Sequence, residues 1–328
     1  MKDVASRAGV ALKTVSRVVN GEPGVTPETA KRVLGAIDDL GFRRNESARL
    51  LRTGQAAALG FIADNSADHD QAAIYRGLEE VATEKGFLLY SGSTRGDPAR
   101  EERLALALCA RRVDGMVIVP TLSDHHYLIA EIKAGVAAVF VLRPPPRIAA
   151  DTGPGDGELG DAVVIDERGG ANSAVAHLIE HGHRRIGYVG GDPGGYRSQR
   201  LMLGYTEAMT AAGLPVDQAW LSVTPGELAS AGVTAVLCGS RARTAQVLRA
   251  LASTGRARRT AVIGFGDFEL ADLVTPGITV VGYDPVRLGR TAGDLLVRRL
   301  AGDDQPPRLV ELPVRLIPRG SAEFPPVD

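Results

Sequence analysis

Near its N-terminus the chain reads KDVASRAGVALKTVSRVVNG, from residue 2 to residue 21. Small and β-branched residues recur with helical spacing on both sides of Gly9, which can take the positive φ of a tight turn. The first run predicts a helix beginning at about Lys2, and the second predicts a helix from about Leu12 to Asn20. Together they predict a helix-turn-helix, whose second helix presents basic and hydroxyl-bearing side chains: Lys13, Ser16 and Arg17.

A third helix has recognisable start and stop signals. Thr26 is placed to cap its N-terminus, Pro27 suits its first position, and Gly41 can end it. One apolar stripe is expected to face the other two helices: Ala30, Val33, Leu34, Ile37 and Leu40. An unspecialised three-helix bundle is the alternative to a DNA-binding head, but the basic face of the second helix argues against it.

Residues 43–54 read RRNESARLLRTG, a segment too short to form a stable helix alone. Its arginines crowd together, while Ala48 and Leu51 are apolar. Such a segment can become ordered on DNA, with an apolar wedge in the minor groove and cations against the phosphates. The alternative is an ordinary linker.

The net charge of −1 conceals an asymmetry between the two ends of the chain. Residues 1–54 carry ten Lys and Arg against six Asp and Glu, or +4, which leaves −5 for the remainder. A basic head on an acidic body indicates a polyanionic partner at one end. The sequence shows no secretion signal, no run of about 18 apolar residues, and no disulfide or metal spacing around Cys109 and Cys238. We therefore expect a cytoplasmic protein with no cofactor, no bound metal and no membrane partner.

After Gly54 short apolar runs alternate with helical segments. The apolar runs are 59–63, 87–90, 115–119, 137–142, 162–165, 185–189, 234–238, 260–264 and 279–281. The helical segments are 74–86, 99–112, 170–181, 199–212 and 242–253. This alternation predicts parallel sheets with right-handed crossovers, and therefore an α/β body behind an all-α head.

Together these motifs closely resemble those of the lactose-repressor (LacI) family. The head matches that family almost residue for residue, in Ala8-Gly9-Val10, Thr14-Val15-Ser16-Arg17-Val18-Val19-Asn20-Gly21 and Val25-Thr26-Pro27-Glu28. The likeness continues along the body, in Arg76-Gly77, Arg112-Val113-Asp114-Gly115, Gly182-His183-Arg184-Arg185-Ile186, Gly204-Tyr205 and Thr275-Pro276. It covers essentially the whole chain.

The resemblance implies three parts: a helix-turn-helix head over 1–44, a hinge over 45–55 and a periplasmic-binding-protein-like body over 56–328. The body would contain two parallel-sheet subdomains joined by three crossing strands: about 56–160 with 284–313, and about 161–281 with 314–320. A protein of this kind is not an enzyme. It is a sequence-specific transcription regulator, a repressor, that binds a palindromic operator in double-stranded DNA as a homodimer and responds to a small-molecule effector.

Eleven residues are expected to contact DNA. Six belong to the second helix: Leu12, Lys13, Thr14, Ser16, Arg17 and Asn20. Five belong to the hinge: Asn45, Ala48, Arg49, Leu51 and Arg52. A recognition helix contacts bases with its N-terminal part and one turn further along the same face, so we expect Leu12, Lys13 and Arg17 to dominate base readout.

The effector cleft departs from the family pattern. Several members hold sugar hydroxyls with carboxylates at three positions, which align here with Leu142, Arg241 and Gly266. The residues expected at the cleft are Asp70, Gln71, Arg143, Arg197, Arg200, Arg241 and Asp267. Clustered arginines suit carboxylate or phosphate groups, which predicts an anionic effector such as a sugar acid or a phosphorylated metabolite. The alternatives are a cleft that binds no small molecule and, third, a neutral sugar.

Two further departures concern helices. The family usually places a Thr-Ile pair before Lys2, so the first helix here would lack its cap, or the true start lies upstream. The family also places an arginine three residues before Gly204, where this chain has Leu201, with Arg200 one position back.

The second subdomain is expected to be trimmed at one edge. Only about a dozen residues separate a strand expected near Trp220 from the next one, which is barely enough for a parallel crossover. Residues 225–231 can therefore form at most a turn or two. Residues 147–160 are rich in Pro and Gly and are interpreted as an exposed loop.

Two other function classes are alternatives to a regulator. A solute-binding protein with the same body fold would carry a secretion signal, and an α/β enzyme would carry a nucleophile beside its base, but the sequence shows neither. His125 and His126 beside Asp124 could hold a metal, but no third ligand is spaced to complete that site, so we interpret them as part of a solvated loop. The helix-turn-helix head argues directly against a solute-binding protein and against an α/β enzyme.

Overall fold

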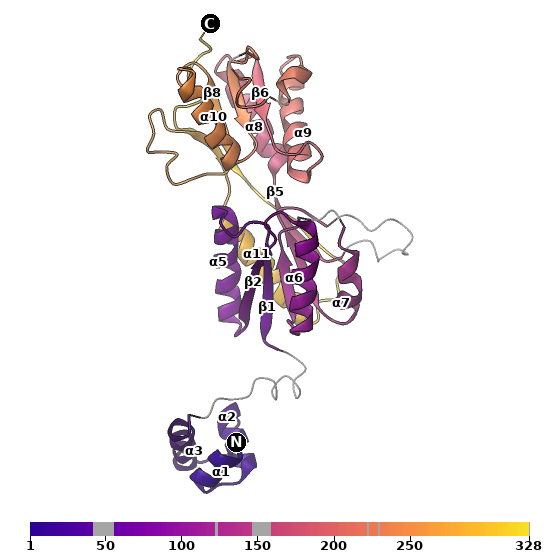
Figure 1. Ribbon diagram of the computed structural model, residues 1–328, viewed down its shortest axis with the longest axis vertical. Helices are drawn as coiled ribbons and strands as arrows, with labels where there is room; N and C mark the ends of the chain where they lie inside the picture. The colour runs from indigo at the N-terminus through magenta and orange to yellow at the C-terminus, as the bar shows by residue number, and fades with distance from the viewer. Residues whose placement is uncertain (42–55, 122–123, 146–158, 222, 229, 328) are drawn as a thin grey trace. The chain divides into compact units, whose positions relative to one another are not determined.

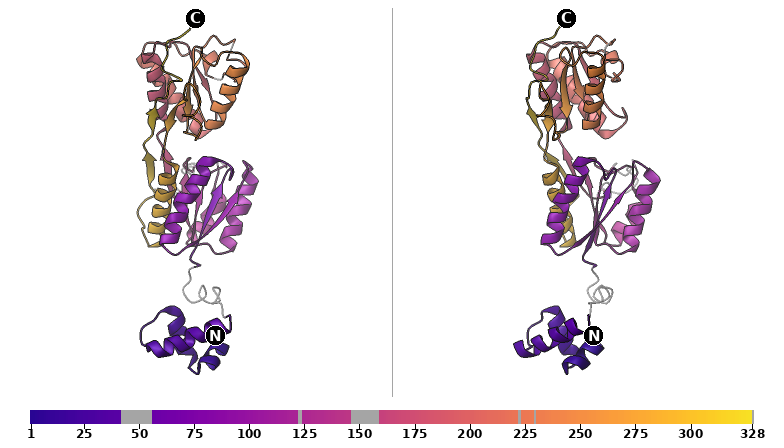
Figure 2. Two further views of the ribbon diagram at one scale, coloured as in Figure 1. Left: turned by 90° about the vertical axis from the view of Figure 1, so that its left-hand side faces the viewer. Right: turned by 60° about the vertical axis from the view of Figure 1, so that its left-hand side comes forward.

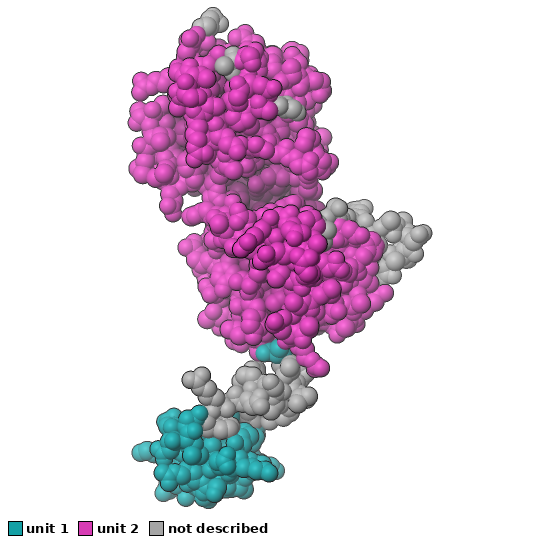
Figure 3. All heavy atoms as spheres, in the orientation of Figure 1, with its two compact units in different colours: residues 1–56 teal, residues 57–328 magenta. Residues whose placement is uncertain are grey.

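A computed structural model describes residues 1–41, 56–121, 124–145, 159–221, 223–228 and 230–327. The chain divides into two compact units, residues 1–56 and 57–328, which are coloured separately in Figure 3. The expected hinge at 45–55 lies outside the described residues. So does the expected loop at 147–160, except for its last two residues, of which Leu159 is buried.

The N-terminal unit contains three helices: α1 (Lys2–Ala8), α2 (Leu12–Asn20) and α3 (Pro27–Asp39). Gly9 ends α1 with a φ of 62°, as the turn requires, and the Thr26 hydroxyl accepts the N–H of Thr29 at the start of α3. These helices confirm the predicted helix-turn-helix. Among the described residues no side chain caps α1.

The core of the head corrects one expectation about α3. Val33 and Ala36 are buried against Val4 and Val15, but Leu34 and Leu40, expected in the apolar stripe, are 52% and 46% exposed. α3 therefore contacts the other two helices along a line through Val33 and Ala36 that is narrower than the predicted apolar stripe. Leu34 and Leu40 lie outside this line and stay exposed.

Within the described residues, the first sheet of the body has six strands in the order β10-β5-β4-β3-β1-β2, and all neighbours are parallel. The strands are β1 (Ala58–Ala63), β2 (Leu88–Ser93), β3 (Gly115–Ile118), β4 (Ala137–Val141), β5 (Asp161–Ile165) and β10 (Leu309–Leu312). The helices are α5 (His69–Glu84), α6 (Pro98–Ala110), the short α7 (Ile129–Lys133) and α11 (Pro285–Leu300). Helices lie on both faces of the sheet (Figure 2), so its inner strands are buried on both faces.

The second sheet has the order β11-β9-β8-β7-β6 in the described part of the chain. Its strands are β6 (Ile186–Val189), β7 (Ala235–Cys238), β8 (Ala261–Phe265), β9 (Thr279–Gly282) and β11 (Arg315–Ile317). Its helices are α8 (Glu167–Glu180), α9 (Tyr196–Ala211) and α10 (Arg241–Ser253) (Figure 1). The predicted parallel arrangement is confirmed for all pairs except β11, which pairs with β9 in antiparallel fashion.

The chain crosses between the two sheets three times. The crossings follow β5, β9 and β10, because α8 belongs with the second sheet, α11 and β10 with the first, and β11 again with the second. The expected start of the second subdomain at residue 161 needs correction, since β5 pairs with β4 and β10 in the first sheet. The first crossing therefore comes after Ile165.

The edge of the second sheet beside β6 contains little regular structure. Trp220 lies in a short 3-10 helix (Gln218–Trp220) and not in the strand expected there. Three residues cannot pair with β6 in that conformation, so β6 is the edge strand among the described residues. The described residues of 225–231 form turns only, in agreement with the predicted shortening.

Candidate nucleic-acid interface and effector cleft

The exposed face of α2 carries the side chains expected to read DNA. Val15 is fully buried and anchors α2 in the head. Leu12 is 47% exposed, Lys13 is also exposed, and Thr14, Ser16 and Arg17 are half-buried. Asn20 is the last residue of α2, but its side chain is not described. The first turn of α2 therefore offers its side chains to the surroundings, as a recognition helix requires.

The N-terminus of α2 is also suited to a phosphate. No side chain in the described head caps α2, which begins after Ala11 in an extended conformation. Uncapped N–H groups and the helix dipole attract anions. A backbone phosphate can therefore be held beside the base-reading side chains. The five expected hinge contacts lie outside the described residues: Asn45, Ala48, Arg49, Leu51 and Arg52.

A cleft of about 460 Å³ lies within the body, where the carboxyl ends of strands from both sheets meet. It corresponds to the hollow across the larger unit in Figure 3. Five of the seven residues expected at the effector site line it: Asp70, Gln71, Arg143, Arg197 and Arg241.

Arg241, the first residue of α10, connects the two sides of the cleft. Its guanidinium lies 3.0 Å from a carboxylate oxygen of Asp70 and 3.6 Å from one of Asp68. Its Nη1 donates to the backbone oxygen of Asp267 at 3.2 Å. Two carboxylates of the first subdomain therefore oppose the charge of an arginine of the second.

Asp70 is held from a third direction by Tyr283, which lies on the second crossing. The Tyr283 hydroxyl donates to Oδ2 of Asp70 at 2.6 Å. Burial raises the pKa of Asp70, while the hydrogen bond from Tyr283 and the charge of Arg241 act to lower it. Asp70, Tyr283 and Arg241 thus form one polar network that spans α5, a crossing and α10.

The other cleft arginines are paired in the same way. Arg143 Nη2 lies 3.0 Å from Oδ2 of Asp64. Arg197 Nε lies 3.6 Å from Oε1 of Glu167, and its guanidinium is 5.5 Å from the centre of the Phe265 ring. Each of the three arginines that line the cleft therefore faces a carboxylate.

The head and the body both match known proteins. The family described as bacterial regulatory proteins, lacI family, matches residues 1–45, and the periplasmic binding protein-like domain matches residues 175–322. The ribose operon repressor of Escherichia coli (strain K12) is 30% identical over 337 residues, which cover 98% of this chain and 99% of that protein. The chain belongs to the lacI family of bacterial regulatory proteins.

Solved structures of lacI-type regulators share this architecture. A complex of the transcriptional regulator CelR with cellobiose is 28% identical and superposes with a TM-score of 0.70, covering 98% of each chain. The lac repressor dimer bound to operator is 24% identical, with a TM-score of 0.81 and 98% of each chain covered, which shows the shared fold.

Membership of the lacI family assigns the function class. The protein is a LacI-type DNA-binding transcriptional repressor, and the family members that match are regulatory repressors, not enzymes. Of the two alternatives, the solute-binding protein does not explain the lacI-type head. In the described chain, no helix combines the length and hydrophobicity needed to cross a bilayer.

Two residues expected at the effector cleft of this lacI-family protein lie outside its lining. Arg200 Nη2 pairs with Glu311 of β10 at 2.6 Å. Asp267 accepts two hydrogen bonds from Arg319, at 2.6 and 2.8 Å, and these lower its pKa. Arg200 and Asp267 are therefore paired with residues on β10 and just after β11, the strands that follow the second and third crossings.

The three positions without family carboxylates have distinct surroundings. Leu142 lines the cleft with a φ of 67°. A Cβ on Gly266 would lie 3.0 Å from Cγ of Arg241, so the arginine side chain fills the space beside this glycine. At the position where the family carries an arginine, Leu201 is fully buried in the core, and the neighbouring Arg200 pairs with Glu311.

The polar residues of the cleft that sequence reasoning missed include Asp64, Asp68, Asp192 and Tyr283. Asp64 directly follows β1, and Asp68 caps α5 by accepting the N–H groups of Asp70 and Gln71. Residues that follow parallel strands or cap the next helix collect at one edge of a sheet, and this signal could have found both aspartates. Tyr283 has no comparable local signal.

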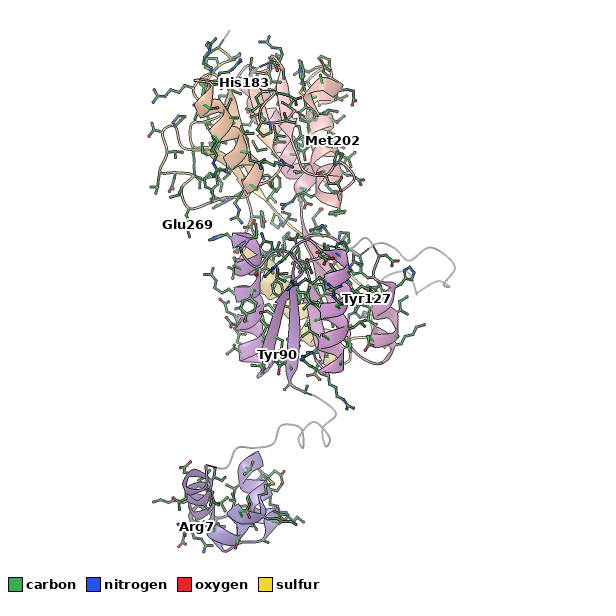
Figure 4. All side chains as sticks on the ribbon, in the orientation of Figure 1. Arg7, Tyr90, Tyr127, His183, Met202 and Glu269 are labelled. Carbon is green, nitrogen blue, oxygen red and sulfur yellow. The ribbon has the colours of Figure 1, made fainter. Side chains whose placement is uncertain are left out.

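The solvated loop expected at His125 and His126 needs correction, because His125 is fully buried. His125 Nε2 lies 2.9 Å from Oε1 of Glu101 with both side chains fully buried, and Tyr127 (labelled in Figure 4) donates to the same oxygen at 3.1 Å. His126 pairs with Asp124. In the part of the chain that the structure describes, no group of three or more His, Cys, Asp or Glu could hold a metal.

Proposed function

We propose that this lacI-family repressor binds a palindromic operator as a homodimer and that its effector is a neutral polyhydroxyl ligand of the sugar class. Leu12, Lys13 and Arg17 read base edges from α2. The effector occupies the cleft between the two subdomains. Operator binding brings the protein to chromosomal DNA in the cytoplasm.

The pairing of the cleft arginines carries the proposal for the effector. Four carboxylates, those of Asp64, Asp68, Asp70 and Asp192, line the cleft beside three arginines. An anion would have to displace the aspartates that pair with Arg143 and Arg241, and it would add negative charge to a lining that has one more carboxylate than arginines. The hypothesis of an anionic effector stays untested, but this charge balance disfavours it.

A sugar can use both partners of the Arg143–Asp64 and Arg241–Asp70 pairs, which line the cleft. Its hydroxyls donate to carboxylates and accept from guanidinium groups, so neither partner is left without a hydrogen bond. Val119, Leu142 and Phe265 supply apolar surface for the carbon skeleton. The carboxylates missing at 142, 241 and 266 are replaced by Asp64, Asp68 and Asp70 from the first subdomain. Two matching proteins are named for sugars, ribose and cellobiose.

The network around Arg241 suggests how the effector acts. Arg241 belongs to the second subdomain, and its partners Asp68 and Asp70 belong to the first. A ligand that takes over these contacts changes the relative stability of the arrangements of the two subdomains. Operator affinity then rises or falls according to which of these arrangements the ligand stabilises.

Thermal denaturation with ligand panels tests the effector class. A ligand that binds only the folded state raises the melting temperature. We expect neutral sugars to stabilise the wild type and Asp70→Asn to abolish this effect, with Glu180→Gln on the surface of α8 as the control. Stabilisation by sugar acids alone, lost in Arg241→Ala, would establish the anionic alternative.

Selection of binding sites from random DNA tests the regulator itself. We expect a near-palindromic consensus bound by the full chain, and an electrophoretic mobility shift with that consensus. A neutral sugar identified by thermal denaturation should then change the measured Kd. Failure to select any sequence would contradict operator binding whatever the effector.

A further inference from the structure

A second concave surface of about 640 Å³ lies at the crossings of the body. Its lining comes from the start of α5, the second and third crossings, β11 and the loop after β8. The charged and aromatic residues among them are His69, Arg76, Asp267, Tyr283, Asp284 and Arg315. We call this surface the hinge pocket, because residues of both subdomains and of two crossings form it; it is distinct from the hinge expected at 45–55.

The basic side chains of the hinge pocket, unlike the arginines of the effector cleft, are not paired with carboxylates. Its carboxylates are engaged: Asp267 binds Arg319, and Asp284 accepts the N–H of Arg287 at the start of α11. The side chains of His69, Arg76 and Arg315 are exposed and, among the described residues, form no direct hydrogen bond or ion pair, although the charge of Arg315 helps to lower the pKa of Asp267. The pocket therefore presents three basic side chains whose hydrogen-bond donors have no direct carboxylate partner among the described residues.

We propose that the hinge pocket is a second ligand site, which binds the phosphate group of a small metabolite. Two guanidinium groups from different elements, Arg76 on α5 and Arg315 on β11, can each offer a phosphate parallel hydrogen bonds. His69 on the first turn of α5 adds a third donor. An anion held by α5 and β11 would connect the first subdomain to a strand of the second.

The hinge pocket is joined to the effector cleft by two direct links. Tyr283 lines both cavities, and its hydroxyl bonds Asp70 in the cleft. His69 and Asp70 are consecutive residues of α5, the first lining the hinge pocket and the second the cleft. A phosphate at the hinge therefore contacts the residues that position the polar network of the cleft, and occupation of one site should alter affinity at the other.

Calorimetric titration with inorganic phosphate tests the site in the full-length protein. Four proteins are compared at constant ionic strength: the wild type, Arg76→Ala/Arg315→Ala, Arg241→Ala and Arg249→Ala. Arg249 is exposed on α10 and lines neither cavity, so its variant matches the loss of one arginine charge. We expect binding to weaken about tenfold or more in the double variant, as the loss of two charge-assisted contacts implies, and to persist in the other two variants.

The outcomes separate this site from the proposed effector cleft. Loss of phosphate binding in Arg241→Ala but not in the double variant would place the anion in the cleft and overturn the hinge site. Equal binding by all four proteins, or no binding by the wild type, would overturn it as well. Melting temperatures without phosphate show whether each variant is folded. None of these readouts needs operator DNA or a sugar, so failure of the proposed function would not alter them.

Discussion

Burial sets the charge state of Glu167, the first residue of α8. Its side chain is fully buried, and desolvation raises its pKa to about 7, although the charge of Arg197 lowers it in part. The folded protein therefore binds this proton more tightly than the unfolded chain, in which the pKa is the ordinary 4.5. Below both pKa values the carboxyl is protonated in the folded and in the unfolded chain, so it causes no pH dependence of stability. The free energy of unfolding then falls as pH rises from about 4.5 to 7, because the unfolded chain loses this proton more readily than the folded protein does.

Replacement of Glu167 by Gln should remove this pH dependence. We expect the melting temperature of Glu167→Gln, relative to the wild type, to increase between pH 5 and pH 8. The limit set by the difference between the two pKa values is on the order of 3 kcal/mol. Thermal denaturation at both pH values measures it, with Glu180→Gln as the exposed control on the same helix. A pH-independent difference would contradict the raised pKa.

Arg17 on α2 is expected to determine specificity at one position of the operator. A guanidinium that bonds O6 and N7 of guanine discriminates by about 1–3 kcal/mol, so Arg17→Ala should lose that much affinity on the best site. Sites selected from random DNA should also become degenerate at this base pair. Arg32→Ala, exposed on α3, is the control. An identical consensus from the wild type and Arg17→Ala would reject the assignment.

At the scale of elements, apolar periodicity located most helices and strands but not their starts. The helices expected from 74, 170 and 199 begin at His69, Glu167 and Tyr196. Their first turns are polar, and in two cases a side chain, that of Asp68 or Asp166, caps the helix. Capping depends on single polar residues, which a search for apolar stripes does not detect. Two helices were missed: α7, because its five residues carry too little periodicity, and α11, whose segment was assigned to the first subdomain but not to a helix.

The contact between α5 and α11 depends on a pair of glycines. A Cβ on Gly289 would lie 2.0 Å from the backbone oxygen of Ile74, and one on Gly77 would lie 2.1 Å from that of Val286. Gly289→Ala must therefore push the two helices apart, and we expect a loss of roughly 3 kcal/mol in the free energy of unfolding of the body. Chemical denaturation measures this loss.

A helical glycine without such a contact provides the opposite expectation. Gly35 on α3 has no atom within 4 Å of an added Cβ. Gly35→Ala should stabilise the head by up to about 1 kcal/mol, because alanine favours helix more than glycine does. Destabilisation by both substitutions to a similar extent would show that close packing is not the cause at Gly289.

Leu51 is expected to act as the wedge of the hinge, a segment outside the described residues. In a dimer, two such side chains would meet at the centre of the operator and open one base step. Leu51→Ala should then lose operator bending and affinity, while the thermal unfolding of the body stays unchanged. Gel mobility of circularly permuted operator fragments measures the bend. An unchanged bend angle would leave the segment as a linker.

At the scale of the whole molecule, the sequence could place the effector cleft but not its electrostatics. Arg143, Arg197 and Arg241 were predicted from the resemblance to the lacI family, which puts them at or near the rim of the family's effector cleft. Their carboxylate partners were not predicted, because the pair Arg241–Asp70 joins residues 171 positions apart in different subdomains. Such a pair exists only after the subdomains have assembled, and it changes the class of ligand that the cleft favours.

Two exposed apolar surfaces in the body support a dimer. Leu88 and Tyr90 (labelled in Figure 4) are exposed on β2, the edge strand of the first sheet, and Leu270 and Leu273 are exposed on the loop after β8. Exposed apolar groups on an unpaired sheet edge mark interaction surfaces.

We therefore expect a dimer in sedimentation experiments, and a shift toward monomers in Leu88→Glu/Tyr90→Lys. Leu203→Glu serves as the control, since Leu203 is similarly exposed but lies on α9. The double variant should bind the palindromic operator at least about tenfold more weakly, because two linked heads gain from an effective local concentration that separate heads lack. Binding to a single half-site should be unchanged, which separates lost dimerisation from a damaged head. A stable tetramer, or a wild-type monomer that binds the palindrome with full affinity, would contradict this assembly.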